Sequence, residues 1–198
     1  MTNREHSNAT LTIDLGALAS NYRLLAGKFT GRHVGAAVKA DGYGHGAARV
    51  AGALQDAGAK TFGVAITEEA VELREAGVSG AILVFGGCFP GQEETFVELG
   101  LTPTIYDMDA VRRLSEVALA RGQVVGYHLK LDTGMGRLGI GPDDVAGFVE
   151  QATGYNGAWL EGIFSHLSSA DEDDLTYTRQ QISIYTEAVD AIEAAGHH

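Results

Sequence analysis

The chain has 198 residues, enough to bury a hydrophobic core, and carries 26 acidic against 14 basic residues, a net charge of −12. No Lys/Arg cluster provides the basic surface that nucleic-acid binding needs, so we expect no nucleic-acid partner. The apolar runs are a few residues long, far below the roughly 20 that span a bilayer, so we expect no membrane partner.

The single cysteine, Cys88, excludes an internal disulfide. The opening stretch "MTNREHSNAT" contains no apolar segment of the kind that signal peptides have. Together these features favour the reducing cytoplasm as the compartment. We expect Cys88 to be a small packed hydrophobe rather than a nucleophile.

Apolar and amphipathic segments alternate along the chain. A helix is predicted first, at residues 15–28. Strands are then predicted at residues 34–39, 61–66, 81–85, 102–106, 125–132 and 160–166. Further helices are predicted at residues 44–57, 67–76, 91–99, 107–121, 142–153 and 173–195. This alternation predicts an α/β fold with a parallel sheet, either open and doubly wound or most of an eight-stranded barrel.

Ionisable side chains stand at the ends of three predicted strands. Lys39 ends the first strand, Lys130 and Asp132 end the fifth, and His166 ends the sixth. Arg137 follows in the glycine-rich loop after the fifth strand. Because parallel α/β folds bind ligands beyond the carboxyl ends of their strands, these residues are the candidates for a site.

Lys39 lies in the segment "AAVKADGYGHGAAR". A partly desolvated lysine can attack an aldehyde as the free amine, which is the chemistry of a Schiff base. The glycines that follow allow a sharp turn with space for a bulky ligand, and Tyr43 and His45 add hydrogen-bonding groups. The alternative is a solvated charge, the more usual state of a single lysine at a strand end.

The fifth strand and its loop read "HLKLDTGMGRLG". Alternation places His128, Lys130 and Asp132 on one side of this strand. Three ionisable groups on a buried strand are costly unless they are paired or serve a site. Arg137 suits an anionic ligand group, whereas an internal Lys–Asp–Arg ion-pair network that fixes the loop is an equally open alternative.

Other motifs compete with this site. Gly42, Gly44 and Ala47 match the dinucleotide-binding pattern G-x-G-x-x-G/A, with Glu68 about 20 residues further on. The match is weak, because Lys39 and the two residues after it separate the strand from the first glycine. His166 is either a site residue or a histidine that is hydrogen-bonded within the core. No metal-ligand spacing and no G-x-S-x-G elbow is found.

Four segments resemble bacterial alanine racemases that depend on pyridoxal phosphate: "LTIDLGALASNYRLL", "AAVKADGYGHGA", "HLKLDTGMGRLG" and "FSHLSSAD". They span nearly the whole chain. The resemblance implies a parallel (β/α)8 barrel of the TIM type, incomplete here, with about six βα units in residues 15–198. It also implies that residues 1–14 include a strand that pairs with a C-terminal β domain.

The resemblance also assigns roles to individual residues. Lys39 would form the Schiff base with pyridoxal 5′-phosphate and act as the base for one enantiomer. Tyr43 would line the phosphate site, Arg137 would contact the phenolic oxygen and the substrate carboxylate, and His166 would lie beneath the cofactor ring. Lys130 would be carbamylated, which replaces two facing cations by an anion paired with Arg137.

The implied function is interconversion of L- and D-alanine through proton transfer at Cα, which supplies D-alanine for peptidoglycan. Full-length members of the family are homodimers. The main alternative is a non-catalytic pyridoxal-phosphate carrier of the same barrel type, although the lysine motif of such carriers differs from "VKADGYGHG". A nicotinamide-dependent enzyme is a third and weaker possibility.

Family members are about twice as long as this chain. The loops after strands seven and eight, which usually hold the phosphate, have no counterpart in this sequence. The same holds for the arginine that faces the pyridine nitrogen and for the tyrosine base that crosses the dimer interface. We therefore expect an incomplete racemase that is poorly stable and inactive alone.

Overall fold

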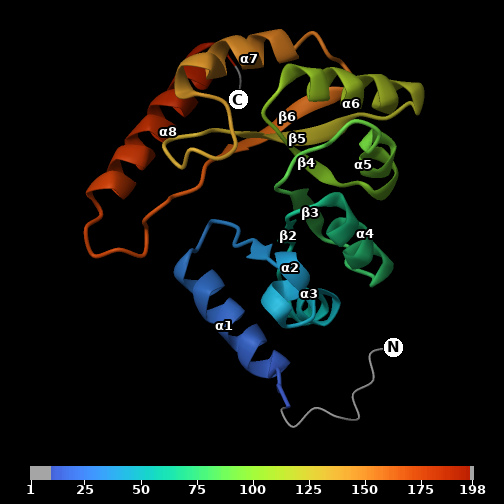
Figure 1. The fold of residues 1–198 in the computed structure, drawn as a ribbon, viewed down its shortest axis with the longest axis vertical. Helices are drawn as coiled ribbons and strands as arrows, with labels where there is room; N and C mark the ends of the chain where they lie inside the picture. The colour runs from blue at the N-terminus through green and yellow to red at the C-terminus, as the bar shows by residue number, and fades with distance from the viewer. Residues whose placement is uncertain (1–9, 197–198) are drawn as a thin grey trace.

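Six parallel strands form the centre of the computed structural model, which describes residues 10–196 (Figure 1). They are β1 (Ala36–Ala37), β2 (Thr61–Val64), β3 (Ala81–Val84), β4 (Thr102–Ile105), β5 (Val125–Lys130) and β6 (Ala158–Phe164). The strands lie side by side in sequence order, from β1 to β6. A doubly wound sheet would reverse its strand order at a switch point, so the sequential order and the curvature of the sheet identify a partial barrel.

Helices connect the strands and cover the convex side of the sheet (Figure 1). They are α1 (Leu15–Lys28), α3 (Ala47–Asp56), α4 (Thr67–Glu75), α5 (Glu93–Leu99), α6 (Met108–Ala120), α7 (Val145–Ala152) and α8 (Thr176–Ala194), with the 3-10 turn η2 (Pro142–Asp144) ahead of α7. The short segment α2 (Lys39–Gly44), which follows β1, is a left-handed turn and not a regular helix. The αβ alternation predicted from the apolar pattern is therefore confirmed.

Local side-chain chemistry explains where two of the helices begin. The Asp14 carboxylate accepts the N–H of Ala17 at 2.9 Å, and α1 starts directly after it. Asp107 accepts the N–H of Ala110 at 2.8 Å at the start of α6. Aspartate stabilises both positions because it satisfies one of the free N–H groups of a first helical turn.

The hydrophobic core lies between the sheet and the helices on its convex side. Phe62 and Ile82 are fully buried and stand next to each other in the pairing of β2 with β3. Fully buried side chains from the helices complete this layer: Ala70, Leu73, Phe96, Val111 and Leu114. Burial of each large side chain contributes about 1.5–3 kcal/mol, so this layer holds the strand ends in place.

The structure corrects several predicted boundaries. β1 has two residues instead of the six predicted, because the chain turns away at Lys39 and only β2 pairs with it. The helix predicted at residues 44–57 begins at Ala47, after a separate turn. Residues 1–9 and 197–198 lie outside the described residues, and Thr10–Asp14 are assigned to no strand. The pairing of residues 1–14 with a C-terminal domain therefore stays a prediction.

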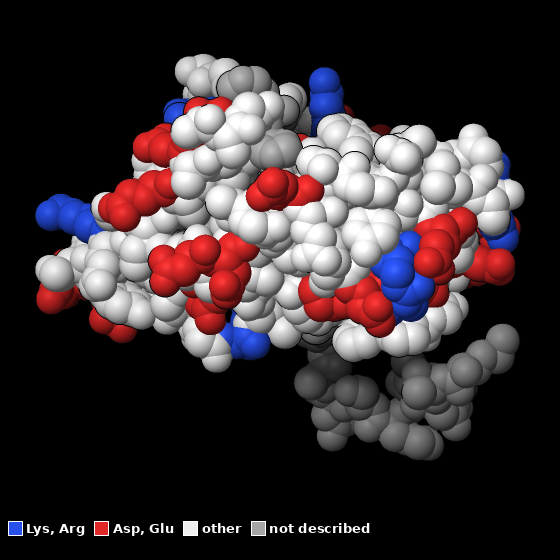
Figure 2. Space-filling model, turned by 90° about the horizontal axis from the view of Figure 1, so that it is seen from above, with Lys and Arg blue, Asp and Glu red and all other residues white. Residues whose placement is uncertain are grey.

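Acidic side chains outnumber basic ones on the face of the molecule shown in Figure 2, in agreement with the net charge of −12. The described helices include none that is long and apolar enough to cross a membrane.

Candidate functional site

Lys39 stands where the chain leaves β1 and turns sharply. The buried Val38 before it donates its N–H to the carbonyl oxygen of Gly63 at 2.8 Å, so pairing with β2 runs up to the lysine. Residues 40–43 then have φ values of 52°, 53°, 61° and 55°, all in the left-handed region. For residues other than glycine this conformation costs about 1–2 kcal/mol each. Such a turn persists only where its surroundings hold it, and strained segments cluster at functional sites.

Hydrogen bonds hold this left-handed turn from inside. Gly42 donates its N–H to the Val38 carbonyl at 2.8 Å, and Gly46 donates to the Asp41 carbonyl at 2.9 Å. The Asp41 carboxylate accepts the N–H of Ala47 at 2.7 Å and so ties the turn to α3. The predicted sharp turn is confirmed, although most of its left-handed residues are not glycines.

The two hydrogen-bonding side chains of the turn lie differently. His45 Nδ1 lies 2.9 Å from the Gly42 carbonyl and 3.1 Å from the Tyr43 carbonyl, so its ring serves the backbone of the turn. Tyr43, by contrast, is exposed.

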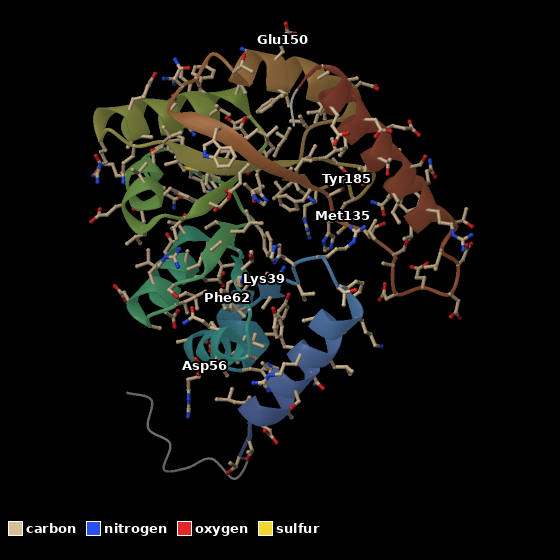
Figure 3. The ribbon with its side chains drawn as sticks, turned by 180° about the vertical axis from the view of Figure 1, so that it is seen from behind. Lys39, Asp56, Phe62, Met135, Glu150 and Tyr185 are labelled. Carbon is tan, nitrogen blue, oxygen red and sulfur yellow. The ribbon has the colours of Figure 1, made fainter. Side chains whose placement is uncertain are left out.

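Aromatic rings and a lysine line the side of the sheet opposite the helices. Phe85 lies against Gly63, where a Cβ atom would overlap its ring. The rings of Phe85 and Phe164 are 6.2 Å apart, and Lys130 Nζ lies 4.6 Å from the centre of the Phe164 ring. Figure 3 shows Lys39 and Met135, from the loop after β5, on this same concave side. The site therefore has an aromatic floor with cations above it.

Lys130 is buried without a hydrogen-bonding partner. Its side chain is among the few buried charged groups, at 6% exposure, and Nζ bonds to no described residue. Burial and the charge of Arg137 lower the pKa of Lys130 to about 8, against the opposing effect of Asp132. A substantial fraction of this lysine is therefore a neutral, nucleophilic amine in mildly basic solution.

The loop after β5 is held by Asp132. Its carboxylate accepts the N–H groups of Gly134 at 2.9 Å and Gly136 at 3.0 Å. Among the described residues no salt bridge joins Lys130, Asp132 and Arg137, and Lys130 Nζ is unpaired. The alternative of an internal ion-pair network is therefore wrong. Asp132 instead shapes the loop because its carboxylate accepts backbone N–H groups of Gly134 and Gly136.

Three cations converge on His166. Burial lowers the pKa of His166, and the charges of Lys130, Arg137 and Lys39 lower it further. The residues that act on His166 stand at or just beyond the carboxyl ends of β1 and β5, and His166 itself follows β6. The structure thus brings four of the five predicted site residues together and places the fifth, Tyr43, in the turn that begins at Lys39.

A buried glutamine links the two loops of this site, and sequence reasoning missed it. Gln181 of α8 is fully buried, and its Nε2 donates to the His166 carbonyl at 3.1 Å and to Thr133 Oγ1 at 3.3 Å. Its Oε1 accepts the N–H of Ser168 at 2.9 Å. The one available signal was a polar residue on the helical face that also carries Tyr185 and Ala188.

The competing motifs do not form sites of their own. Glu68, which the dinucleotide pattern requires, is exposed on α4, and the sequential strand order has no switch point, so that hypothesis is wrong. Within residues 10–196, no three His, Cys, Asp or Glu side chains are placed to share a metal ion. Cys88 is buried, and burial raises the pKa of its thiol to about 12, as expected for an inert packed residue.

These features define a class of protein. A barrel-type parallel sheet carries a strand-end lysine, two more cations and a histidine at the carboxyl ends of its strands. This is an α/β-barrel protein with a candidate site, rich in cationic side chains, at the carboxyl ends of its strands.

Comparison with known proteins narrows the class to a family. Residues 13–198 match the model of the alanine racemase N-terminal domain. The chain is 40% identical over 184 residues to the alanine racemase of Symbiobacterium thermophilum, covering 93% of this chain and 49% of that protein. It is 37% identical over 185 residues to the alanine racemase of Clostridium tetani, covering 93% and 48%. The chain therefore belongs to the alanine racemase family, through its N-terminal domain.

Solved structures agree with this assignment. Alanine racemase from D-cycloserine-producing Streptomyces lavendulae superposes with a TM-score of 0.87 and 33% identity, over 96% of this chain and 52% of that one. Alanine racemase of Clostridium difficile 630 in complex with cycloserine gives 0.87 and 28%, over 96% and 54%. The chain spans about half the length of the curated relatives it matches.

Proposed function

We propose that the protein is a pyridoxal-phosphate-dependent alanine racemase. The observation that carries this proposal is the placement of Lys39, Lys130, Arg137 and His166 at or just beyond the carboxyl ends of β1, β5 and β6. Membership of the alanine racemase family supports the same reaction, the interconversion of L- and D-alanine.

The residues present fit pyridoxal phosphate. The unpaired Lys130 Nζ, the aromatic floor and the cations suit a flat ring that carries a phosphate and a phenolic oxygen. In this proposal Tyr43 contacts the phosphate, Arg137 contacts the phenolic oxygen and the substrate carboxylate, and His166 lies beneath the ring. When bound, the cofactor supplies an aldehyde for a lysine amine and an electron sink for the reaction at Cα.

Lys39 is the proposed attachment residue and one of two bases. Its amine takes the proton from Cα of one enantiomer and returns it in the reverse direction. Inversion at Cα needs a second acid–base group on the opposite face, a role that the family resemblance gives to a tyrosine of the C-terminal domain.

Lys130 is the proposed site of carbamylation. Its neutral nitrogen bonds to the carbon of CO₂ and releases a proton, which leaves an anionic carbamate. This change removes the repulsion between Lys130 and Arg137 that lowers the pKa of the lysine, and it gives Arg137 an anionic neighbour.

The wider setting follows from the same family. We propose that the full-length protein is a homodimer that supplies D-alanine for peptidoglycan. The single cysteine is compatible with the reducing cytoplasm as its compartment.

The attachment of the cofactor can be tested directly. The chain is incubated with pyridoxal phosphate and reduced with borohydride, which adds hydride to the C=N bond and leaves a stable secondary amine on the lysine. Peptide mapping by mass should find the modification at Lys39 and not at Lys28, Lys60 or Lys130. Modification of the other lysines alone would reject the proposal.

Racemisation separates the racemase from a carrier. A full-length version should racemise alanine, and Lys39→Ala should abolish this activity. Modification at Lys39 without any racemisation by the full-length protein would favour the non-catalytic carrier instead.

A further inference from the structure

One carboxylate holds the left-handed turn after Lys39 from outside. Glu69, in the first turn of α4, accepts the N–H of Ala40 through Oε1 at 2.7 Å. Its Oε2 accepts the N–H of Ala65 at 2.7 Å and that of Ile66 at 3.4 Å. Both carboxylate oxygens are engaged, and they tie the ends of β1 and β2 to α4. Ionised acceptors make shorter and stronger hydrogen bonds than neutral ones.

The bond from Ala40 acts on the backbone of Lys39 itself. The Ala40 N–H belongs to the peptide group that follows Lys39, so its orientation defines ψ of the lysine. On the other side of the lysine, the Val38 carbonyl, which belongs to the peptide group before Lys39, accepts the N–H of Gly42 at 2.8 Å. These two bonds fix the backbone around Lys39, and the backbone sets the direction in which the side chain leaves Cα.

We propose that Glu69 is a positioning residue for Lys39, which aims the lysine amine at the aldehyde carbon of pyridoxal phosphate by holding the Ala40 N–H. This inference rests on the proposed function. In the step that Glu69 assists, the Lys39 nitrogen bonds to the aldehyde carbon, the aldehyde oxygen leaves as water, and a C=N bond remains.

Three variants of the chain isolate this effect. Glu69→Gln keeps the shape of the side chain, but it removes the charge and replaces one of the two acceptor oxygens by an NH2 donor, so the N–H groups of Ala40 and Ala65 can no longer each face a carboxylate oxygen. Glu68→Gln is the charge control, because Glu68 is the exposed neighbour of Glu69 in the same helical turn.

The third variant, Ser115→Ala, controls for loss of stability. Ser115 Oγ accepts the buried N–H of Gly157 at 2.9 Å, in the turn that enters β6. This turn lies at the amino ends of the strands, whereas Lys39 lies at a carboxyl end. The variant therefore weakens the fold by a lost hydrogen bond without altering the turn after Lys39.

The first readout is the rate at which pyridoxal phosphate becomes trappable at Lys39 by borohydride, measured by peptide mapping across the pH range. Glu69→Gln should be slower by about tenfold at every pH, because a misaimed nucleophile reacts more slowly. The second readout is the visible circular dichroism per bound cofactor, which reports a fixed orientation of the ring and should decrease in the same variant. Glu68→Gln and Ser115→Ala should match the unmodified chain within about twofold in both.

Three results would contradict the proposed role of Glu69. Capture by Glu69→Gln at the rate of the unmodified chain would overturn it. An equal loss in Ser115→Ala would also overturn it, because lowered stability would then explain the effect. If the unmodified chain showed no modification at Lys39, the proposed function would fail first, and this inference with it.

Discussion

Replacing Lys130 by methionine should stabilise the chain, because the fold buries this lysine at a cost. Its Nζ has no hydrogen-bonding partner among the described residues and lies against the Phe164 ring. Methionine keeps the length of the side chain, removes the charge and retains a favourable sulfur contact with the ring. The perturbation therefore removes the buried charge while leaving the packing nearly unchanged.

The size of the effect follows from the pKa of Lys130, which is about 8 in the folded chain against 10.5 for a free lysine. Each pH unit between these values corresponds to about 1.4 kcal/mol, so the protonated lysine lowers the free energy of unfolding by up to about 3 kcal/mol below pH 8. Between pH 8 and 10.5 the unfolded chain binds a proton that the folded chain has released. Stability of the unmodified chain therefore rises with pH in this window.

The assay is urea unfolding at pH 7 and pH 10 in buffers free of CO₂. Lys130→Met should be more stable than the unmodified chain by about 1–3 kcal/mol at pH 7, and the difference should shrink towards pH 10. The exposed Lys60 gives the matched control, Lys60→Met, which should change little at either pH. If Lys130→Met were no more stable at pH 7, or if its advantage did not depend on pH, the reasoning about a buried unpaired charge would be refuted.

Three further predictions concern the support of the fold and of the site. Gly157→Ala should lower the free energy of unfolding in urea by about 1–3 kcal/mol, because its Cβ would overlap the Ser115 carbonyl; an unchanged midpoint would contradict this. Arg113→Met should lower the free energy of unfolding by about 3 kcal/mol at pH 7, because Glu93 is 5% exposed and would lose the 2.7 Å bond to Arg113. Burial acts to raise the pKa of Glu93, but hydrogen bonds from backbone N–H groups and Arg113 lower it overall. The loss of stability in Arg113→Met should therefore shrink as acid protonates Glu93 in the variant and in the unmodified chain. Gln181→Leu should lower the free energy of unfolding by about 1–3 kcal/mol, since it leaves buried polar groups unpaired, and it should speed amide hydrogen exchange in both loops that the glutamine joins. Faster exchange in only one of the two loops would contradict this link.

The α/β architecture could be predicted because its signals are local. Some strands are short apolar runs, such as Ala81–Val84, and helices such as Met108–Ala120 have a clear amphipathic pattern. The helix predicted at residues 15–28 has the same bounds in the structure, where the Asp14 carboxylate caps its first turn. The order of the strands is different in kind, because it depends on which distant segments pair. Periodicity left two folds open, and only the family resemblance favoured the barrel.

The candidate site could be predicted in its residue types but not in its construction. The left-handed backbone of residues 40–43 contradicts the local preferences of Ala40, Asp41 and Tyr43. Besides the hydrogen bonds within the turn, it is held by Glu69, which accepts the N–H of Ala40 across 29 residues of sequence. No local pattern contains such information, because the contact that stabilises the turn comes from another βα unit. The same limit hid Gln181, whose partners lie in two separate loops.

The distribution of charge relates the acidic chain to its cationic site. The net charge is −12, and acidic side chains lie on the outer surface (Figure 2), whereas Lys39, Lys130 and Arg137 meet around His166. At physiological salt, charges are screened over about 8 Å in solvent, so the acidic surface acts weakly at the site. The cations repel each other within a partly buried space where screening is less effective. The phosphate of the proposed cofactor, or the proposed carbamate on Lys130, would relieve this repulsion, so the charges of the site are consistent with the proposed function although the chain as a whole is acidic.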